Sequence, residues 1–200
     1  MHVRLTRPDD GEALAAIYAP SVAGIVSFEE VPPNGEELAR RAAALLPHTP
    51  WLVAERQGEV AGYAYASPHR QRAAYRWAVD TSVYVHRGHR RVGVARHLME
   101  VLLEVLRRQG FHRAHAGVTL PNPASVGLHE RLGFRPVGVY PEVGFTQGAW
   151  HDVGWWTLPL RPMGEPPEAT RPVTGRLVAE GEAAVRAAAR QGRPPTGGRR

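Results

Sequence analysis

A turn rich in arginine and glycine, residues 86–95, separates a strand-like run from an amphipathic, helix-like run. Its sequence is His-Arg-Gly-His-Arg-Arg-Val-Gly-Val-Ala. The first N–H groups of a helix are unpaired and carry partial positive charge, and Gly93 lacks a Cβ that would keep a ligand from the backbone. We therefore expect the turn to suit a pyrophosphate, although a solvated basic turn has the same composition. Its spacing matches neither G-x-G-x-x-G nor the Walker loop, which argues against a Rossmann or P-loop nucleotide site.

A second cationic loop, residues 69–77, precedes the strand that leads into this turn. It holds three arginines together with His69, Tyr75 and Trp77. A guanidinium group presents paired donors that match the two oxygens of a carboxylate or phosphinate, and a tyrosine hydroxyl adds a further donor. The loop is therefore predicted to bind the anionic end of a ligand.

The composition removes several kinds of chemistry. The chain has no cysteine and no lysine, so its 25 basic residues other than histidine are all arginine. Disulfides, thiolate metal sites, a cysteine nucleophile, Schiff-base catalysis and a P-loop lysine are thereby excluded. The pairs His86-x-x-His89 and His112-x-x-His115 lack a third ligand at a recognisable spacing, so we expect no metal.

The net charge of +6 is distributed unevenly. Residues 161–200 hold eight Arg and four Glu and so carry +4, which leaves residues 1–160 nearly neutral. A basic total is typical of nucleic-acid-binding proteins, but here it reports mainly on a C-terminal segment, and we do not expect nucleic acid as a partner. No apolar signal core and no run near the ~18 apolar residues of a membrane span is present, so we expect a cytoplasmic protein without membrane association.

Strand and helix patterns alternate along residues 3–160. Capping spacings at Asp9 and Asn34 predict two helices after a first strand, and Gln57-Gly58 predicts a hairpin. We expect strands at residues 3–6, 51–55, 60–66, 75–85, 114–118, 134–140 and 152–160, and helices from about residue 10 and at 34–46, 94–109 and 125–132. This order predicts an α/β (α+β) fold, a mixed sheet with helices on both faces.

The composition changes after Leu160, where a segment rich in Pro, Gly, Ala and Arg begins. We predict one domain at residues 1–160 and a tail at residues 161–200. Residues 177–190 are compatible with an Ala-rich helix, but they contain few large apolar residues with which to anchor it. The tail is therefore expected to be mobile or to order on a partner.

Two motifs resemble signatures of one enzyme superfamily. Arg90-x-x-Gly93-x-Ala95 resembles the R/Q-x-x-G-x-G/A motif of the GNAT N-acetyltransferases, and residues 122–134, which end in Leu-Gly-Phe, resemble their second motif. Residues 51–55, 81–85 and 148–154 extend the similarity to the phosphinothricin and methionine sulfone (sulfoximine) acetyltransferase branch. The resemblance covers about residues 3–160. It implies a centrally splayed sheet of six to seven strands and acetyl transfer from acetyl-CoA to a primary amine.

By this resemblance, the coenzyme lies along the splay of the sheet and the turn that follows. The backbone of Val83, Tyr84 and Val85 would bind the pantetheine arm as an added strand, and one of their N–H groups would stabilise the thioester oxyanion. Asn122 would also contact the coenzyme. The residues implied at the pyrophosphate are Arg90, Arg91, Val92, Gly93, Val94 and Ala95.

Acetyl transfer to an amine needs one group that takes the ammonium proton and another that protonates the leaving thiolate. The resemblance places Asp80 where related enzymes usually carry a Glu base, so this chain departs from the pattern by one methylene. Three roles are open for Asp80: a direct base, a base acting through water, or an anchor for the ammonium. His129, seven residues after Asn122, lies where the branch carries a histidine near the coenzyme sulfur, and it is the candidate acid.

On the acceptor side, Arg72 and Tyr75 match branch positions that contact the anionic end of the substrate, which ranks them above the other arginines of their loop. Phe28 matches an aromatic residue of the pocket, although core packing explains it equally well. Residues 150–151 lie in a segment that closes the pocket near a dimer interface in the branch. A homodimer is therefore implied.

The function predicted from the sequence is N-acetylation of a small, anionic, amino-acid-like substrate by direct attack in a ternary complex. Peptide or protein N-termini are an alternative, whereas a polyamine or aminoglycoside pocket would be acidic and the arginine-bearing loop argues against it. Two alternatives belong to other classes. One is a coenzyme A-binding pseudoenzyme or sensor, supported only by Asp80 in place of Glu, and the other is a nucleic-acid-binding protein that acts through the arginine-rich tail.

Overall fold

The structure, a computed structural model, describes residues 1–46, 48–162 and 168–192. It contains a seven-stranded mixed sheet in the order β1-β2-β3-β4-β5-β7-β6. The strands are β1 (His2–Leu5), β2 (Trp51–Arg56), β3 (Glu59–Pro68), β4 (Ala78–Val85), β5 (Arg113–Thr119), β6 (Arg135–Thr146) and β7 (Ala149–Pro159). The α-helices within the described ranges are α1 (Gly11–Val22), α2 (Gly35–Leu45), α3 (Val94–Gln109), α4 (Pro123–Arg131) and α5 (Gly175–Arg190).

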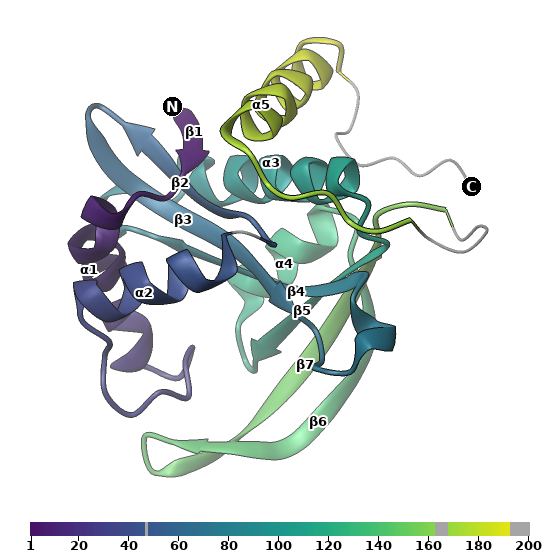
Figure 1. Cartoon of the computed structure of the whole chain (residues 1–200). Helices are drawn as coiled ribbons and strands as arrows, with labels where there is room; N and C mark the ends of the chain where they lie inside the picture. Colours follow the sequence, from purple (N-terminus) through teal and green to yellow (C-terminus); the bar gives the residue numbers. More distant parts are fainter. Residues whose placement is uncertain (47, 163–167, 193–200) are drawn as a thin grey trace.

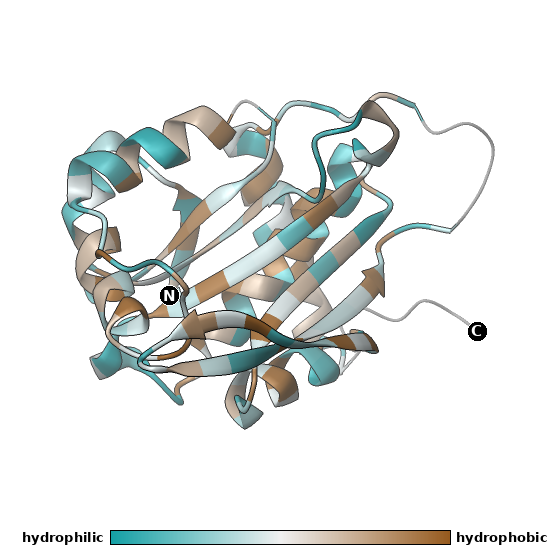
Figure 2. Ribbon diagram, turned by 90° about the horizontal axis from the view of Figure 1, so that it is seen from below, coloured by the Kyte–Doolittle hydropathy of each residue, from teal (hydrophilic) through white to brown (hydrophobic). Residues whose placement is uncertain are grey.

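Helices cover both faces of the sheet, as predicted (Figure 1). α1 and α2 lie on one face, over an apolar cluster that includes Trp51 and Tyr63. α3 and α4 lie on the other face, over a larger cluster that includes Leu52 and Val79. Figure 2 shows apolar and polar residues alternating along the strands. Because successive side chains of a strand point to opposite faces, the central strands β2, β3 and β4 supply both clusters.

The predicted order of elements is confirmed, with two differences at strand ends. A short 3-10 turn (Ala73–Tyr75) replaces the expected start of the fourth strand, so β4 begins only at Ala78. β6 and β7 form one long hairpin, whereas the sequence predicted two shorter strands at residues 134–140 and 152–160. Gln147 and Gly148 both have positive φ, 50° and 75°, which is the pair of left-handed conformations that a tight two-residue hairpin turn requires.

The sheet splays between β4 and β5, as expected. These parallel strands pair only from Ala78 to Asp80, opposite Arg113 to His115. β4 continues to pair with β3 as far as Val85, while β5 continues to pair with β7 as far as Thr119. Residues 81–85 of β4 therefore have one strand partner, and a wedge opens in the middle of the sheet.

The C-terminal segment differs from the mobile tail that was expected. α5 packs across α3, with Val178 and Val185 buried (Figure 1). Gly181 allows the close approach, because a Cβ there would lie 2.9 Å from Val105 Cγ2. Small residues, counted in the sequence as weak anchors, are thus what lets the helix dock. Residues 163–167 and 193–200, which also belong to the expected tail, lie outside the described residues.

Candidate active site

Asp80 occupies the last paired position between β4 and β5. Across the β3–β4 pairing it stands opposite Ser67, and four residues further along Tyr84 stands opposite Tyr63. Residues an even number apart in a strand share a face, and Tyr63 belongs to the cluster under α1 and α2. The side chain of Asp80 therefore lies on the α1/α2 face, at the point where the sheet opens.

Aromatic and charged side chains gather around Asp80. Nδ1 of His69 lies 2.6 Å from Asp80 Oδ1. His115, the strand partner of Asp80, stacks on His69 with ring centroids 4.3 Å apart. Trp155 makes an edge contact with His69 at 6.1 Å, and the guanidinium of Arg70 lies 6.0 Å from the Trp155 ring centroid. We call these five residues the Asp80 cluster.

Burial changes the proton affinities in the Asp80 cluster. It raises the pKa of Asp80, while the hydrogen bond and charge of His69 and the charge of Arg70 act in the opposite direction. Burial also lowers the pKa of His115 to about 4, and the charges of His69, Arg113 and Arg70 reinforce this effect. His115 is therefore a neutral ring at pH 7.

A cleft of about 360 Å³ opens between α1, α2 and the sheet. Trp51, Tyr63 and Tyr65 give it an aromatic floor, in which Trp51 and Tyr65 stack with centroids 4.2 Å apart. Ser67 also lines the cleft, and it is the cross-strand neighbour of Asp80. The cleft thus extends to the strand position that carries Asp80.

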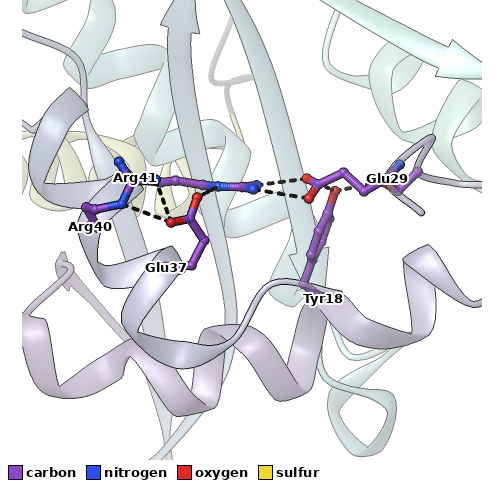
Figure 3. Close-up of polar contacts among 6 residues, drawn as sticks. Tyr18, Glu29, Glu37, Arg40 and Arg41 are labelled. Carbon is purple, nitrogen blue, oxygen red and sulfur yellow. Dashed lines mark hydrogen bonds and ion pairs between the residues drawn. The ribbon is translucent and has the colours of Figure 1, made fainter. Parts of the chain in front are cut away.

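A polar network fixes the rim of this cleft (Figure 3). Arg41 lies between two carboxylates, with Nη1 donating to Glu29 Oε1 at 2.8 Å and Nε donating to Glu37 Oε1 at 2.7 Å. The hydroxyl of Tyr18 donates to the same Glu29 oxygen at 2.9 Å. Hydrogen bonds from Arg41 hold the pKa of Glu29 below its ordinary value, so the pair stays ionised and ties the loop after α1 to α2.

The turn predicted to bind a pyrophosphate leads directly into α3. Gly93 precedes the first residue of the helix with a φ of 88°, and Arg91 has a φ of 62°. A Cβ on Gly93 would meet no described atom within 4 Å, so the backbone there faces open space. Arg90 and Arg91 are exposed. The free N–H groups at the start of α3 therefore face an open, cationic surface.

Val83, Tyr84 and Val85 lie where β4 has separated from β5. Their backbone groups on that side have no strand partner among the described residues, so they are available to an added strand. Their side chains pack into the two apolar clusters, Val83 and Val85 on the α3 side and Tyr84 on the α1 side. These residues combine a core role with an open backbone edge.

α4 contains His129, and Asn122 precedes its first residue. Asn122 Oδ1 caps the helix by accepting from Ser125 N at 3.1 Å. His129 is buried, and its Nδ1 lies 2.9 Å from the carbonyl oxygen of Ser125, which fixes the proton on Nδ1. Its Nε2 is buried and unpartnered within the described chain. Burial lowers the pKa of His129, so the resting ring is neutral, and the acid role stays a prediction.

The three predicted acceptor-side residues are only partly brought together. Tyr75 is 44% exposed, and its ring centroid lies 6.2 Å from that of His69, at the Asp80 cluster. Phe28 lies over Gly144 of β6, where a Cβ would overlap its ring. The Arg72 side chain is exposed and makes no hydrogen bond to a described residue. Arg70, ranked below Arg72 from the sequence, is the arginine that the structure places at the Asp80 cluster.

The sequence profile of the "Acetyltransferase (GNAT) family" matches residues 9–134. The chain belongs to this family.

Relatives of this GNAT acetyltransferase carry related names. It is 42% identical over 149 residues, 74% of this chain and 81% of the relative, to a phosphinothricin N-acetyltransferase of Streptomyces viridochromogenes. It is 34% identical over 162 residues, 80% of this chain and 95% of the relative, to an L-methionine sulfoximine/L-methionine sulfone acetyltransferase of Salmonella typhimurium. A phosphinothricin acetyltransferase from Sinorhizobium meliloti, solved with acetyl-CoA, superposes with a TM-score of 0.76 at 34% identity and covers 87% of this chain and 94% of its own.

GNAT enzymes use acetyl-CoA, and three features of this chain fit that molecule. The separated edge of β4 suits the amides of the pantetheine arm, the open backbone at Gly93 suits the pyrophosphate, and the unpartnered Nε2 of His129 suits a thiol. No group of three or more acidic, histidine or cysteine side chains suited to a metal occurs in the described ranges. None of the described helices has the length and apolar character required to cross a bilayer.

Sequence reasoning missed three members of the Asp80 cluster. His69 was noted only as part of a cationic loop, His115 only as half of a discounted metal pair, and Trp155 not at all. Their proximity depends on the registers that set His115 beside Asp80 and Trp155 beside Gly117. The alternation of His115 and Gly117 along β5 was the one available signal, since it puts both on one face.

Proposed function

We propose that this GNAT enzyme acetylates the primary amine of a small, anionic, amino-acid-like substrate of the phosphinothricin or methionine sulfone/sulfoximine type. The observation that carries the proposal is the presence of Arg70 and Asp80 in one cluster. A guanidinium fits the carboxylate of an α-amino acid, and the negative charge of Asp80 in the same cluster attracts its ammonium. The names of the relatives support the same substrate class.

In the proposed reaction, the amine attacks the thioester carbonyl directly in a ternary complex, so that a C–N bond forms and the C–S bond breaks. Acetyl-CoA supplies the activated acyl group. Backbone groups of residues 83–85 bind the pantetheine arm and stabilise the oxyanion. The Asp80 cluster receives the ammonium proton, and His129 is the proton donor to the leaving thiolate. The remaining roles follow the sequence prediction: coenzyme binding by residues 90–95 and Asn122, and acceptor binding by Phe28, Arg72 and Tyr75.

The proposal includes a homodimer formed through the β6–β7 hairpin. Large apolar side chains are exposed there, with Val137 at 64% and Trp150 at 61%. Contiguous exposed apolar residues are typical of protein interfaces, and Phe28 reaches the same hairpin at Gly144. We also expect the enzyme in the cytoplasm, where its donor is made.

The test is a screen of thiol release from acetyl-CoA with phosphinothricin, methionine sulfone and methionine sulfoximine as acceptors. The matched control is the amino alcohol of each acceptor, in which the carboxylate is reduced. Losing a charge-assisted pair costs about 1.5–3 kcal/mol, so kcat/KM should fall roughly 10- to 100-fold for the alcohol. Arg70→Gln should produce the same fall, whereas Arg76→Gln, whose guanidinium lies over Trp77, should not.

Two results contradict the proposed substrate class. Turnover of peptides with free N-termini but of none of the analogues would move the enzyme to protein substrates. Tight binding of acetyl-CoA without turnover of any amine would make it a sensor. A fall in kcat/KM for Arg72→Gln alone would keep the class and move the anion site to Arg72.

A further inference from the structure

His69 and Asp80 form a hydrogen-bonded pair on the α1/α2 face of the sheet. Nδ1 of His69 lies 2.6 Å from Asp80 Oδ1. A carboxylate only accepts, so Nδ1 carries the proton and the lone pair of the neutral ring lies on Nε2. The ring therefore directs its basic nitrogen away from Asp80.

The His69 ring is held in place while Nε2 stays unused. His115 stacks against one face, and Trp155 makes an edge contact. The His69 side chain is 15% exposed, and no residue in the described part of the chain hydrogen-bonds its Nε2. A ring fixed on three sides with a free nitrogen is oriented in advance for proton transfer.

The neighbours of His69 determine which side chain in the Asp80 cluster can act as a base near neutral pH. Asp80 faces His69 from β4, while His115 and Arg113 on β5 and Arg70 in the loop surround the cluster. His115 is a poor base, because burial and the neighbouring charges lower its pKa to about 4. Tyr75, whose ring centroid lies 6.2 Å from that of His69, is a half-exposed phenol at the edge of the cluster.

We propose that His69 takes the proton of the substrate ammonium on Nε2 and that Asp80 is its positioning residue. The inference rests on the function proposed above. One N–H bond of the ammonium breaks as its proton binds Nε2, and the freed lone pair then attacks the thioester carbon. The C–S bond breaks, the new amide nitrogen loses its second proton, and the coenzyme A thiolate takes up a proton through His129. Asp80 offsets the charge of the imidazolium across the hydrogen bond, and the ring later returns the proton to solvent. The arrangement parallels the Asp–His part of a serine protease triad, in which the carboxylate fixes the tautomer.

The substitution His69→Asn separates a base from a positioning residue. Its amide N–H replaces Nδ1–H and keeps the bond to Asp80, but it offers no basic nitrogen. Because a proton-transfer group contributes about 10²–10⁴-fold, we expect kcat at pH 7 to fall at least 100-fold, the acidic limb of the kcat/KM profile to disappear, and the KM for acetyl-CoA to stay unchanged. His112→Asn, in the segment before β5, is the matched control and should keep the wild-type kcat and profile.

The double variant tests whether the two residues act as a unit. Asp80→Asn should lower kcat, and adding it to His69→Asn should cost little more, because residues that act together are not additive. Retention of kcat within threefold in His69→Asn, or additive losses in the double variant, would overturn the inference. The first result would return the base role to Asp80.

Nitrogen NMR of the His69 ring provides a readout that needs no acceptor. The proton of the neutral ring should lie on Nδ1, where it is hydrogen-bonded to Asp80, and a wild-type ring with its proton on Nε2 would overturn the pair. The kinetic comparison uses whichever amine the wild type acetylates. If the wild type acetylates a peptide and His69→Asn lowers kcat as expected, only the proposed substrate class is overturned. A wild type that acetylates no amine would overturn both proposals.

Discussion

Two histidines lie against each other beside Asp80, and their surroundings give them different properties. His115 is held neutral because burial and neighbouring charges lower its pKa to about 4. His69 instead has a carboxylate partner at 2.6 Å. Two stacked imidazolium rings would repel each other, so a neutral His115 allows His69 alone to accept a proton.

Replacing His115 by valine should make the protein more tolerant of acid. The folded protein holds the pKa of His115 below its unfolded value, so the folded state binds fewer protons between about pH 6.5 and 4, and stability falls as the pH drops through this window. His115→Val removes that loss. We expect the variant to gain about 1 kcal/mol relative to wild type at pH 4.5, since solvent screens a half-buried ring.

Thermal unfolding at pH 8 and pH 4.5 measures this effect. The difference in Tm between His115→Val and wild type should become more positive at the lower pH. An equal Tm difference at both pH values would contradict the lowered pKa of His115.

Among single residues, the sequence indicated those candidate site residues that belong to a local motif. Asp80, Asn122 and Gly93 could be found because their neighbours along the chain identify them. His69 could not be found in its role, because its contact with Asp80 depends on how the loop folds back over β4. His115 was missed because the sequence does not reveal which residue of β5 pairs with Asp80.

Among the elements, the turn before α3 combines a left-handed backbone conformation with open space beside it. Gly93 has a φ of 88°, and the space in front of it is free of described atoms. A left-handed conformation costs about 1–2 kcal/mol for a residue with a Cβ. The turn therefore depends on glycine for its shape as well as for access to the backbone.

Gly93→Ala should raise the KM for acetyl-CoA about tenfold while kcat stays within threefold, because the added methyl projects into the space expected for the pyrophosphate. It should also lower Tm by a few degrees through backbone strain. Gly58→Ala is the matched control, since Gly58 has a φ of 85° with open space beside it but lies in the β2–β3 hairpin. Steady-state kinetics with varied acetyl-CoA concentration measure the KM of both variants. Equal KM values in the two variants would show that Gly93 serves the fold alone.

Helices with local signals were predicted well, and long-range features of the sheet were not. α3 runs from Val94 to Gln109, the predicted limits, because its apolar face and Gly110 mark it locally. The extent of the β6–β7 hairpin was missed although Gln147-Gly148 repeats the Gln57-Gly58 signal. The splay was expected from family resemblance, because no local pattern records where two strands separate.

Over the whole molecule, α5 joins the two ends of the described chain through Glu182. This buried carboxylate accepts from the backbone N–H of Val3 at 3.1 Å and from Arg186 at 2.8 Å, and it lies 3.3 Å from His97 Nε2. Burial raises the pKa of Glu182, but the hydrogen bonds from Arg186, His97 and His2 outweigh it and leave the pKa below its ordinary value. Glu182 thus fastens α5 to β1 and α3.

Glu182→Ala should lower the free energy of unfolding by about 2–3 kcal/mol, because it leaves the buried N–H of Val3 and the guanidinium of Arg186 without their acceptor. The loss should shrink as the pH falls below about 4.5, since a lowered carboxylate pKa stabilises the fold only above its unfolded value. Urea denaturation at pH 7 and pH 4 measures both effects. Glu180→Ala, two residues earlier in α5 and in an exposed ion pair, should cost less than about 0.5 kcal/mol, and equal losses would contradict the role of Glu182.

The reliance of Val3 on Glu182 has a consequence for the order of events during translation. β1 is an edge strand of the sheet, and its carboxylate partner lies 179 residues further along the chain. A ribosome exposes all seven strands before α5 emerges, so the growing sheet presents an uncovered edge during that interval. Unpaired edges promote association between chains. α5, the last of the described helices, therefore covers this edge only late in synthesis, and the nascent enzyme is most prone to aggregation just before α5 emerges.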